Sequence, residues 1–133
     1  MIIDHIGFYV ANLDRMAAFY DVALAPLGIK RLMQFPGGIG YGSTKNGGKK
    51  AELWLHAPTL VHDQNGGVTK PHVHIALSAA NNAEVDAFYK AAMNAGAKDN
   101  GAPGKREIYH PNYYGAFVLD PEGHNLEAVN HNF

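Results

Sequence analysis

The sequence predicts an α+β fold in which one set of elements, a strand, a helix and three further strands, occurs twice in a single domain. Residues 2–10 and 72–77 both alternate apolar and polar side chains, which is typical of strands with one buried face. Each of these segments is followed by one with apolar residues at helical spacing. Short alternating segments, separated by turns rich in Gly and Pro, complete each half.

In the first half, Asn12 is expected to cap a helix that ends near Leu24, because Pro26-Leu27-Gly28 cannot continue it. Three strands are then expected at 30–35, 39–44 and 50–57. In the second half, Asn81 and Glu84 form a capping pair for a helix that stops at Gly96. Strands follow at 105–109, 114–119 and 124–131. We expect module one over 1–57, a linker over 58–71 and module two over 72–133.

Residue spacing indicates that the two halves are an internal repeat. Four short matches occur in the same order along both halves. They are His5-Ile6-Gly7 with His74-Ile75-Ala76 and Phe19-Tyr20 with Phe88-Tyr89, both 69 residues apart, Tyr41-Gly42 with Tyr114-Gly115, 73 apart, and Glu52 and His56 with Glu127 and His131, 75 apart. Longer turns in the second half account for the growing offset.

The composition excludes several classes of protein. With 133 residues, 47% hydrophobic and 17% charged, the chain can bury a core and is not disordered. A net charge of −1 without a basic block speaks against nucleic-acid binding. The lack of an apolar run of about 20 residues speaks against a membrane span. Because there is no cysteine, disulfides and thiolate chemistry are excluded, which favours the cytosol. We therefore expect a cytoplasmic protein with a small-molecule substrate and no nucleic-acid or membrane partner.

Four residues at repeat-related positions point to chemistry. Each half has one His on its first strand and one Glu on its last strand, on the face opposite the aliphatic side chains: His5, Glu52, His74 and Glu127. If the helices cover the aliphatic faces, the other faces form a cup lined by imidazoles and carboxylates. Nitrogen and oxygen donors of this kind suit Zn²⁺, Mn²⁺, Fe²⁺ or Ni²⁺. We predict that the four residues bind one divalent metal ion, and that Glu52 or Glu127 moves a proton.

Two of these assignments have competitors, and each ligand has a simpler interpretation. Trp54 lies on the same face as Glu52 and is an alternative occupant of its position, while His72 shares a face with His74. A single His on a strand is commonly hydrogen-bonded or solvated, and a single Glu beside apolar residues is commonly a surface charge.

A second concentration of polar and aromatic residues lies at 109–114. There, Tyr114 is a candidate to orient or protonate a bound oxyanion, and His110 is a candidate acid or base. The alternative is a turn packed by amphipathic aromatic side chains. The sequence contains neither a Gly-x-Ser-x-Gly nucleophile motif nor a His-Glu-x-x-His metalloprotease motif.

Three pieces of the sequence resemble the vicinal oxygen chelate superfamily, which includes glyoxalases, fosfomycin thiol transferases, extradiol dioxygenases and bleomycin-binding proteins. They are Asp4-His5-Ile6-Gly7 with Phe19-Tyr20, His74-Ile75-Ala76-Leu77 with Phe88-Tyr89, and the run from Phe117 to Glu127. The resemblance covers essentially the whole chain. It implies two βαβββ modules in a pseudo-two-fold arrangement, a cupped mixed sheet with the helices outside, and metal ligands at His5, His74 and Glu127. It also implies a fourth ligand or a base at Glu52.

The resemblance implies an activity and leaves its branch open. The leading expectation is a metal-dependent lyase or isomerase of the glyoxalase-like type, acting on a small oxygenated molecule. The alternatives are an extradiol-type dioxygenase with a catechol-like substrate and a non-catalytic binder, similar to the bleomycin-binding proteins, in which Trp54 holds an aromatic drug. In glyoxalase I, an Arg and an Asn that help to hold glutathione replace Tyr9 and His56 of this chain. We expect a homodimer, because cupped sheets of this size leave edges to cover.

Overall fold

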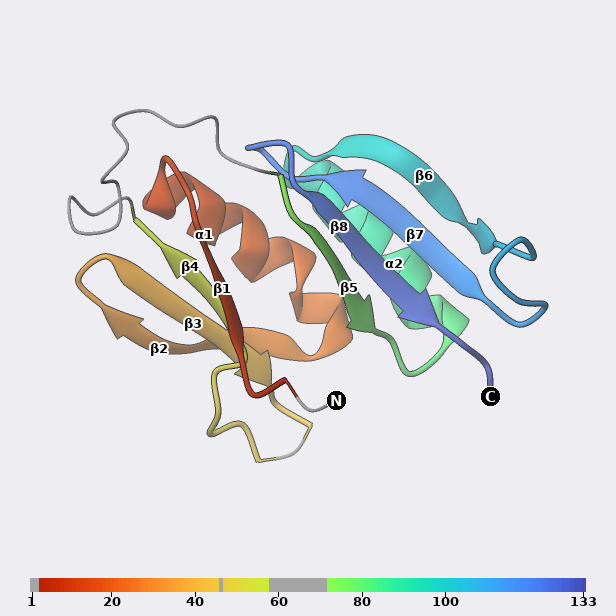
Figure 1. Cartoon of the computed structure of the whole chain (residues 1–133), viewed down its shortest axis with the longest axis horizontal. Helices are drawn as coiled ribbons and strands as arrows, with labels where there is room; N and C mark the ends of the chain where they lie inside the picture. Colours follow the sequence, from red (N-terminus) through yellow and green to blue (C-terminus); the bar gives the residue numbers. More distant parts are fainter. Residues whose placement is uncertain (1–2, 46, 58–71) are drawn as a thin grey trace.

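The computed structural model describes residues 3–45, 47–57 and 72–133 and contains two four-stranded sheets, each with one helix packed against it (Figure 1). The first module consists of β1 (Ile6–Tyr9), α1 (Leu13–Ala23), the 3-10 turn η1 (Ala25–Leu27), β2 (Ile29–Phe35), β3 (Gly38–Ser43) and β4 (Leu53–His56). The second consists of β5 (His74–Ser78), α2 (Asn82–Asn94), β6 (Lys98–Lys105), β7 (Tyr114–Leu119) and β8 (Asn125–Asn130). The predicted linker over 58–71 lies outside the described residues. In the described ranges, neither helix is long and apolar enough to cross a membrane.

The two modules have the same topology. In each, the first strand pairs in parallel with the last, and the remaining neighbours pair antiparallel. The strand orders are β1-β4-β3-β2 and β5-β8-β7-β6. β1 and β5 form the inner edges of the two sheets and are not paired with each other, and both helices lie behind the sheets (Figure 1). The α+β class and the two βαβββ modules are thereby confirmed.

The helix starts confirm the repeat in atomic detail. Asn12 and Asn81, 69 residues apart, are both N-caps with extended backbone, and each side chain accepts a hydrogen bond from the backbone N–H three residues on. The distances are 3.0 Å to the nitrogen of Arg15 and 2.9 Å to that of Glu84. Such a bond satisfies one of the donors that the first helical turn leaves free.

The strand predicted at 105–109 is wrong. The structure has β6 at Lys98–Lys105, and residues 107–109 form a turn. The β6 segment contains Gly101, Pro103 and Gly104, which are typical of loops, but pairing with β7 holds it in the sheet. The register shifts twice along this pair, and Gly101 has a φ of 144° that suits glycine. Tertiary pairing overrode the local preference.

One hydrophobic core spans both modules. The helices bury their apolar stripes, which include Met16, Phe19 and Tyr20 on α1 and Val85 and Phe88 on α2. These side chains cover the aliphatic faces of the sheets, including Leu53 and Leu55 of β4 and Leu126 and Ala128 of β8. Burial of each large side chain contributes about 1.5–3 kcal/mol. The modules therefore share their main source of stability.

A buried hydrogen bond also joins the modules. The Tyr20 hydroxyl on α1 donates to Asp120, 2.9 Å away in the turn before β8, and both residues are buried. Burial raises the pKa of Tyr20, so the phenol stays protonated as a donor. Asp120 also accepts backbone N–H bonds from Glu122 and His124, at 2.9 and 3.0 Å. A second hydrogen bond between the modules runs from the backbone N–H of Ala11 to the Glu122 carboxylate, 2.7 Å away.

We expect Tyr20→Phe to lower the free energy of unfolding by about 1–3 kcal/mol, because it leaves one side of a buried carboxylate without its donor. Tyr89→Phe is the matched control, since the Tyr89 hydroxyl donates to Asp99 at 3.0 Å in an exposed place, and we expect a change within about 0.5 kcal/mol. Urea denaturation measures both variants. Equal losses for the two would show that the Tyr20 bond does not help to hold the modules together.

Candidate active site

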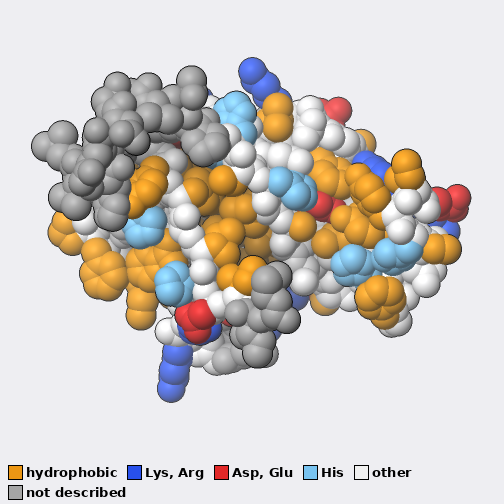
Figure 2. All heavy atoms as spheres, viewed as in Figure 1, with side chains coloured by type: hydrophobic (Ala, Val, Ile, Leu, Met, Phe, Trp, Pro, Cys, Tyr) orange, Lys and Arg blue, Asp and Glu red, His pale blue; other side chains and the backbone are white. Residues whose placement is uncertain are grey.

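The face of the sheets that points away from the helices carries histidine side chains (Figure 2). Figure 2 shows them distributed over both sheets on this face. Strand alternation produces this segregation, because neighbours along a strand point to opposite sides. On β8, for example, Leu126 and Ala128 join the core beneath the sheet, while Glu127 between them points to the other side. We call this side the concave face.

Glu127 is the most unusual residue of the concave face, because it is a carboxylate with only 2% of its surface exposed. Its Oε2 lies 3.2 Å from Nε2 of His74, and its Oε1 accepts a short hydrogen bond from the Tyr113 hydroxyl. A buried carboxylate needs such partners, since desolvation without them is costly. Glu127, His74 and Tyr113 form what we call the Glu127 cluster.

Tyr113 serves the cluster as a hydrogen-bond donor. Burial raises the pKa of its phenol, and the bond to Glu127 raises it further, so the hydroxyl keeps its proton. The neighbouring Gly115 leaves room for this contact. A Cβ on Gly115 would lie 3.1 Å from both Oε1 of Glu127 and a ring carbon of Tyr113.

His74 connects the cluster to solvent. Its side chain is 50% exposed, and its ring lies nearly parallel to that of Phe117 on β7, with centroids 6.3 Å apart. His72, the predicted competitor, lies elsewhere, because its ring is near Gly123 and packs edge-on against His124. Of the two histidines, it is His74 that contacts Glu127.

His5 stands apart from the Glu127 cluster. Its Nδ1 lies 2.8 Å from Oδ1 of Asp4, and its side chain is 60% exposed. Asp4 also pairs with Lys50, whose Nζ is 2.6 Å from its Oδ2. The hydrogen bond with His5 and the contact with Lys50 lower the pKa of Asp4. Asp4 was not singled out from the sequence, although an acidic residue next to a candidate ligand is a usable signal.

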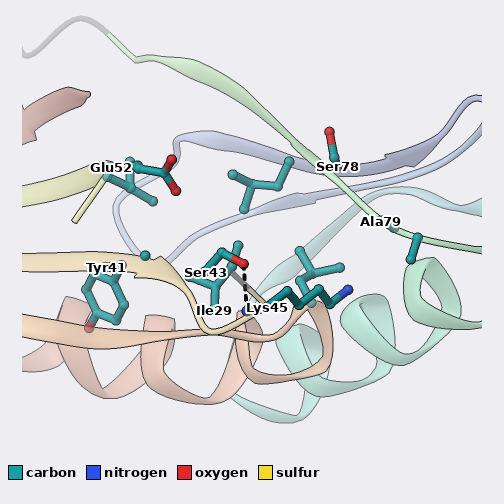
Figure 3. Close-up of a pocket in the computed structure, with 12 residues that line it drawn as sticks. Ile29, Tyr41, Ser43, Lys45, Glu52, Ser78 and Ala79 are labelled. Carbon is teal, nitrogen blue, oxygen red and sulfur yellow. Dashed lines mark hydrogen bonds between the residues drawn. The ribbon is translucent and has the colours of Figure 1, made fainter. Parts of the chain in front are cut away.

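Glu52 faces a different space. It lines a cavity of about 430 Å³ between the modules, together with Tyr41 and Lys45 of the first module and Ser78 of β5. Figure 3 shows its carboxylate pointing into the space between the modules, with Ser78 on the far side. Lys45 is engaged in this region, since its Nζ lies 2.8 Å from Glu84.

Strand pairing gives Glu127 a different counterpart in the first module. In β1 and β4, Gly7 is paired with Trp54, and in β5 and β8, Ala76 is paired with Glu127. Gly7 and Ala76 are equivalent in the repeat, being 69 residues apart. Their partners Trp54 and Glu127 are therefore equivalent as well. The sequence match had aligned Glu52 with Glu127 because residue spacing carries no information on how the strands pair.

The two residues predicted at 109–114 lie in different surroundings. Nε2 of His110 and Nδ1 of His131 share a hydrogen bond of 2.9 Å, and both rings pack against Tyr113. The Tyr114 hydroxyl donates to Asp86 on α2, 2.7 Å away, and this bond raises the pKa of Tyr114. Tyr114 therefore points toward the helix, whereas Tyr113 points toward Glu127. Strand alternation could have predicted this difference, because Tyr114 lies on the same face of the strand as the core residues Ala116 and Val118.

The predicted ligands match a divalent metal ion in chemistry and partly in position. The 3.2 Å between His74 Nε2 and Glu127 Oε2 suits two ligands of one ion, since each lies about 2.0–2.2 Å from the metal in such sites. Within the part of the chain that the structure describes, no three His, Asp or Glu side chains form a group that could hold a metal ion. The structure brings together two of the four predicted residues, His74 and Glu127, while His5 and Glu52 stand outside the pair.

Comparisons with known proteins agree with this architecture. A model of the Glyoxalase/Bleomycin resistance protein/Dioxygenase superfamily matches residues 2–128. A glyoxalase/bleomycin resistance protein from Albidiferax ferrireducens T118 superposes with a TM-score of 0.74 at 23% identity, covering 95% of each chain. A glyoxalase/bleomycin resistance protein/dioxygenase family enzyme from Burkholderia phytofirmans PsJN gives 0.73 at 20% identity, covering 98% of each chain.

A third similar structure is named for its activity. The lactoylglutathione lyase from Agrobacterium tumefaciens superposes with a TM-score of 0.64 at 20% identity, over 96% of this chain and 92% of that one. Among curated proteins, none matches this chain. At these identities the superpositions establish the fold, and the chemistry has to be argued from the residues.

We expect Gly115→Ala to lower the free energy of unfolding by about 1–3 kcal/mol, because the added Cβ pushes against the pinned Glu127 carboxylate and the Tyr113 ring. Gly104→Ala is the control on the paired strand, since its Cβ would meet only the flexible end of Arg106, at 3.2 Å. We expect that control to stay within about 0.5 kcal/mol of the parent. Chemical denaturation measures both, and a harmless Gly115→Ala would contradict the close packing of the cluster.

Proposed function

Because the chain belongs to the Glyoxalase/Bleomycin resistance protein/Dioxygenase superfamily, we propose that it is a lyase or isomerase acting on a small oxygenated molecule. The observation that carries the proposal is the Glu127 cluster, in which a buried carboxylate contacts an imidazole and a phenol. Buried carboxylates with specific partners are common at sites of proton transfer.

The three side chains have complementary roles in this proposal. Glu127 takes a proton from a carbon next to a substrate carbonyl and returns it to a neighbouring atom. The Tyr113 hydroxyl donates to Oε1 and orients the carboxylate, which leaves Oε2 for the substrate side. His74, half exposed beside Oε2, is placed to hold, together with Oε2, an ion that would meet a substrate oxygen. Phe117, parallel to the His74 ring, limits how that ring can turn.

A divalent metal ion is part of the proposal, with His74 and Glu127 as its first two ligands and His5 as the third. When bound, such an ion would stabilise negative charge on a chelated substrate oxygen. The Asp4 carboxylate supports the role of His5, because its hydrogen bond with Nδ1 leaves Nε2 available to bind a metal ion. Glu52 is proposed as a fourth ligand or a base.

The proposal keeps the homodimer expected from the sequence. β2 and β6 are the outer strands of the two sheets, and each is paired on one side only among the described strands. Exposed strand edges are commonly covered by a partner. A molecular mass of about twice 14.4 kDa in light scattering would support the dimer.

We expect His74→Ala, Glu127→Ala and His5→Ala each to abolish stoichiometric binding of Zn²⁺ or Mn²⁺, because each removes a ligand from a site with three or four. Glu52→Ala is expected to weaken binding and to retain some if three ligands suffice. His131→Ala is the control, since this histidine lies outside the proposed set. Isothermal titration calorimetry on metal-stripped protein measures binding, and circular dichroism confirms the fold of each variant.

The identity of the metal discriminates between branches of the family. Zn, Ni or Mn supports the lyase or isomerase, whereas iron together with oxygen consumption in the presence of a catechol would favour a dioxygenase. Full metal occupancy in His74→Ala would contradict the ligand set. Absence of stoichiometric binding by the parent protein would remove the metal from the proposal.

A further inference from the structure

We infer that the concave face of the first module binds a flat aromatic ring and that this ring is part of the substrate. The second half of this statement rests on the proposed function. The binding itself is argued from the first module alone, where several aromatic side chains lie beside glycines of neighbouring strands.

Four side chains, Tyr9, Phe35, Trp54 and His56, form what we call the aromatic row. The Phe35 and Trp54 rings have centroids 5.8 Å apart and planes within 5° of each other. Trp54 and His56 are 6.0 Å apart with planes within 11°. Tyr9 is 5.7 Å from His56 and more tilted, at 43°. Three rings from β2 and β4 therefore have almost the same orientation, although β3 separates these two strands.

Glycines on the neighbouring strands make this arrangement possible. Gly40 of β3 is paired with Trp54, and a Cβ on Gly40 would lie 2.9 Å from two atoms of the indole ring. A Cβ on Gly7 of β1 would lie 2.8 Å from Nε2 of His56. Neither distance is compatible with a side chain unless the ring moves. Because β1 and β3 carry glycine at these two positions, the Trp54 and His56 rings can lie directly over the backbone of these strands.

The rings of the aromatic row are exposed to different degrees. Phe35 is 58% and Tyr9 41% exposed, and Trp54 and His56 are half-buried. Exposed apolar side chains that cluster, rather than occur singly, mark binding surfaces. The shared orientation of the rings indicates the occupant, because aromatic rings associate in defined offset or edge geometries at centroid distances of about 4.5–7 Å. A flexible aliphatic chain would bury apolar surface there but could not form such ring–ring contacts.

The position of the row connects it with the proposed chemistry. Trp54 occupies in the first module the place that Glu127 occupies in the second. β1 and β5 are the inner edges of the two sheets, and both concave faces lie on the side away from the helices (Figure 1). A substrate with a flat ring on the first module would direct its oxygen atoms toward the Glu127 cluster. The two modules would then divide recognition and chemistry between them.

Trp54 is the only tryptophan of the chain, so its indole N–H gives one resonance that reports on the row directly. We would titrate metal-free protein with 2-naphthol and with decahydro-2-naphthol, which share a carbon skeleton and one hydroxyl but differ in flatness and aromaticity. Neither alcohol chelates a metal. We expect 2-naphthol to shift the indole resonance saturably and the saturated alcohol to bind at least several-fold more weakly. Similar responses to both, or none to 2-naphthol, would overturn the inference.

Two variants locate the binding. Phe35→Leu should weaken 2-naphthol binding by about three- to tenfold, as expected for the loss of one aromatic contact. Phe133→Leu, which removes an exposed ring outside the row, should bind like the parent. Equal binding by Phe35→Leu, or an indole shift that follows protein concentration and thus reports self-association through the row, would overturn the inference. His74→Ala should bind 2-naphthol normally, so that failure of the proposed chemistry leaves this result intact.

Discussion

The Asp120 carboxylate is the polar group on which the arrangement of the two modules depends. It is buried, and it accepts hydrogen bonds from the Tyr20 hydroxyl of the first module and from two backbone N–H groups of its own turn. Three donors offset the cost of taking the charge out of water. The same turn leads directly into β8, so the group that ties the modules together also sets the start of the strand that carries Glu127.

The two modules show how one scaffold supports two kinds of surface. Both bury an aliphatic face under a helix, and both use strand alternation to present other side chains on the opposite face. The first module places Trp54 where the second places Glu127. In each case a glycine makes room, Gly40 beside the indole and Gly115 beside the carboxylate. The scaffold tolerates this divergence because the concave face contributes less to the shared core.

The sequence was informative wherever local physics decides the structure. The two N-caps, Asn12 and Asn81, follow from side-chain chemistry and were correctly predicted. The strand at 114–119 was also correct, because its alternation matches its burial. β6 was misplaced because Gly101, Pro103 and Gly104 favour a loop until β7 pairs with them. Tyr113 was not selected over Tyr114, although the alternation of β7 already assigned Tyr114 to the helix side.

By itself the sequence determined the fold class, the repeat and the faces on which His74 and Glu127 lie, because periodicity and capping are local properties of the chain. Tertiary structure alone decided which of these residues meet. The contact of His74 with Glu127 and the equivalence of Trp54 with Glu127 both depend on strand register, and register is set by pairing between segments about 50 residues apart. A shift of two residues preserves the face and changes the neighbour, so alternation in the sequence cannot distinguish the possible partners.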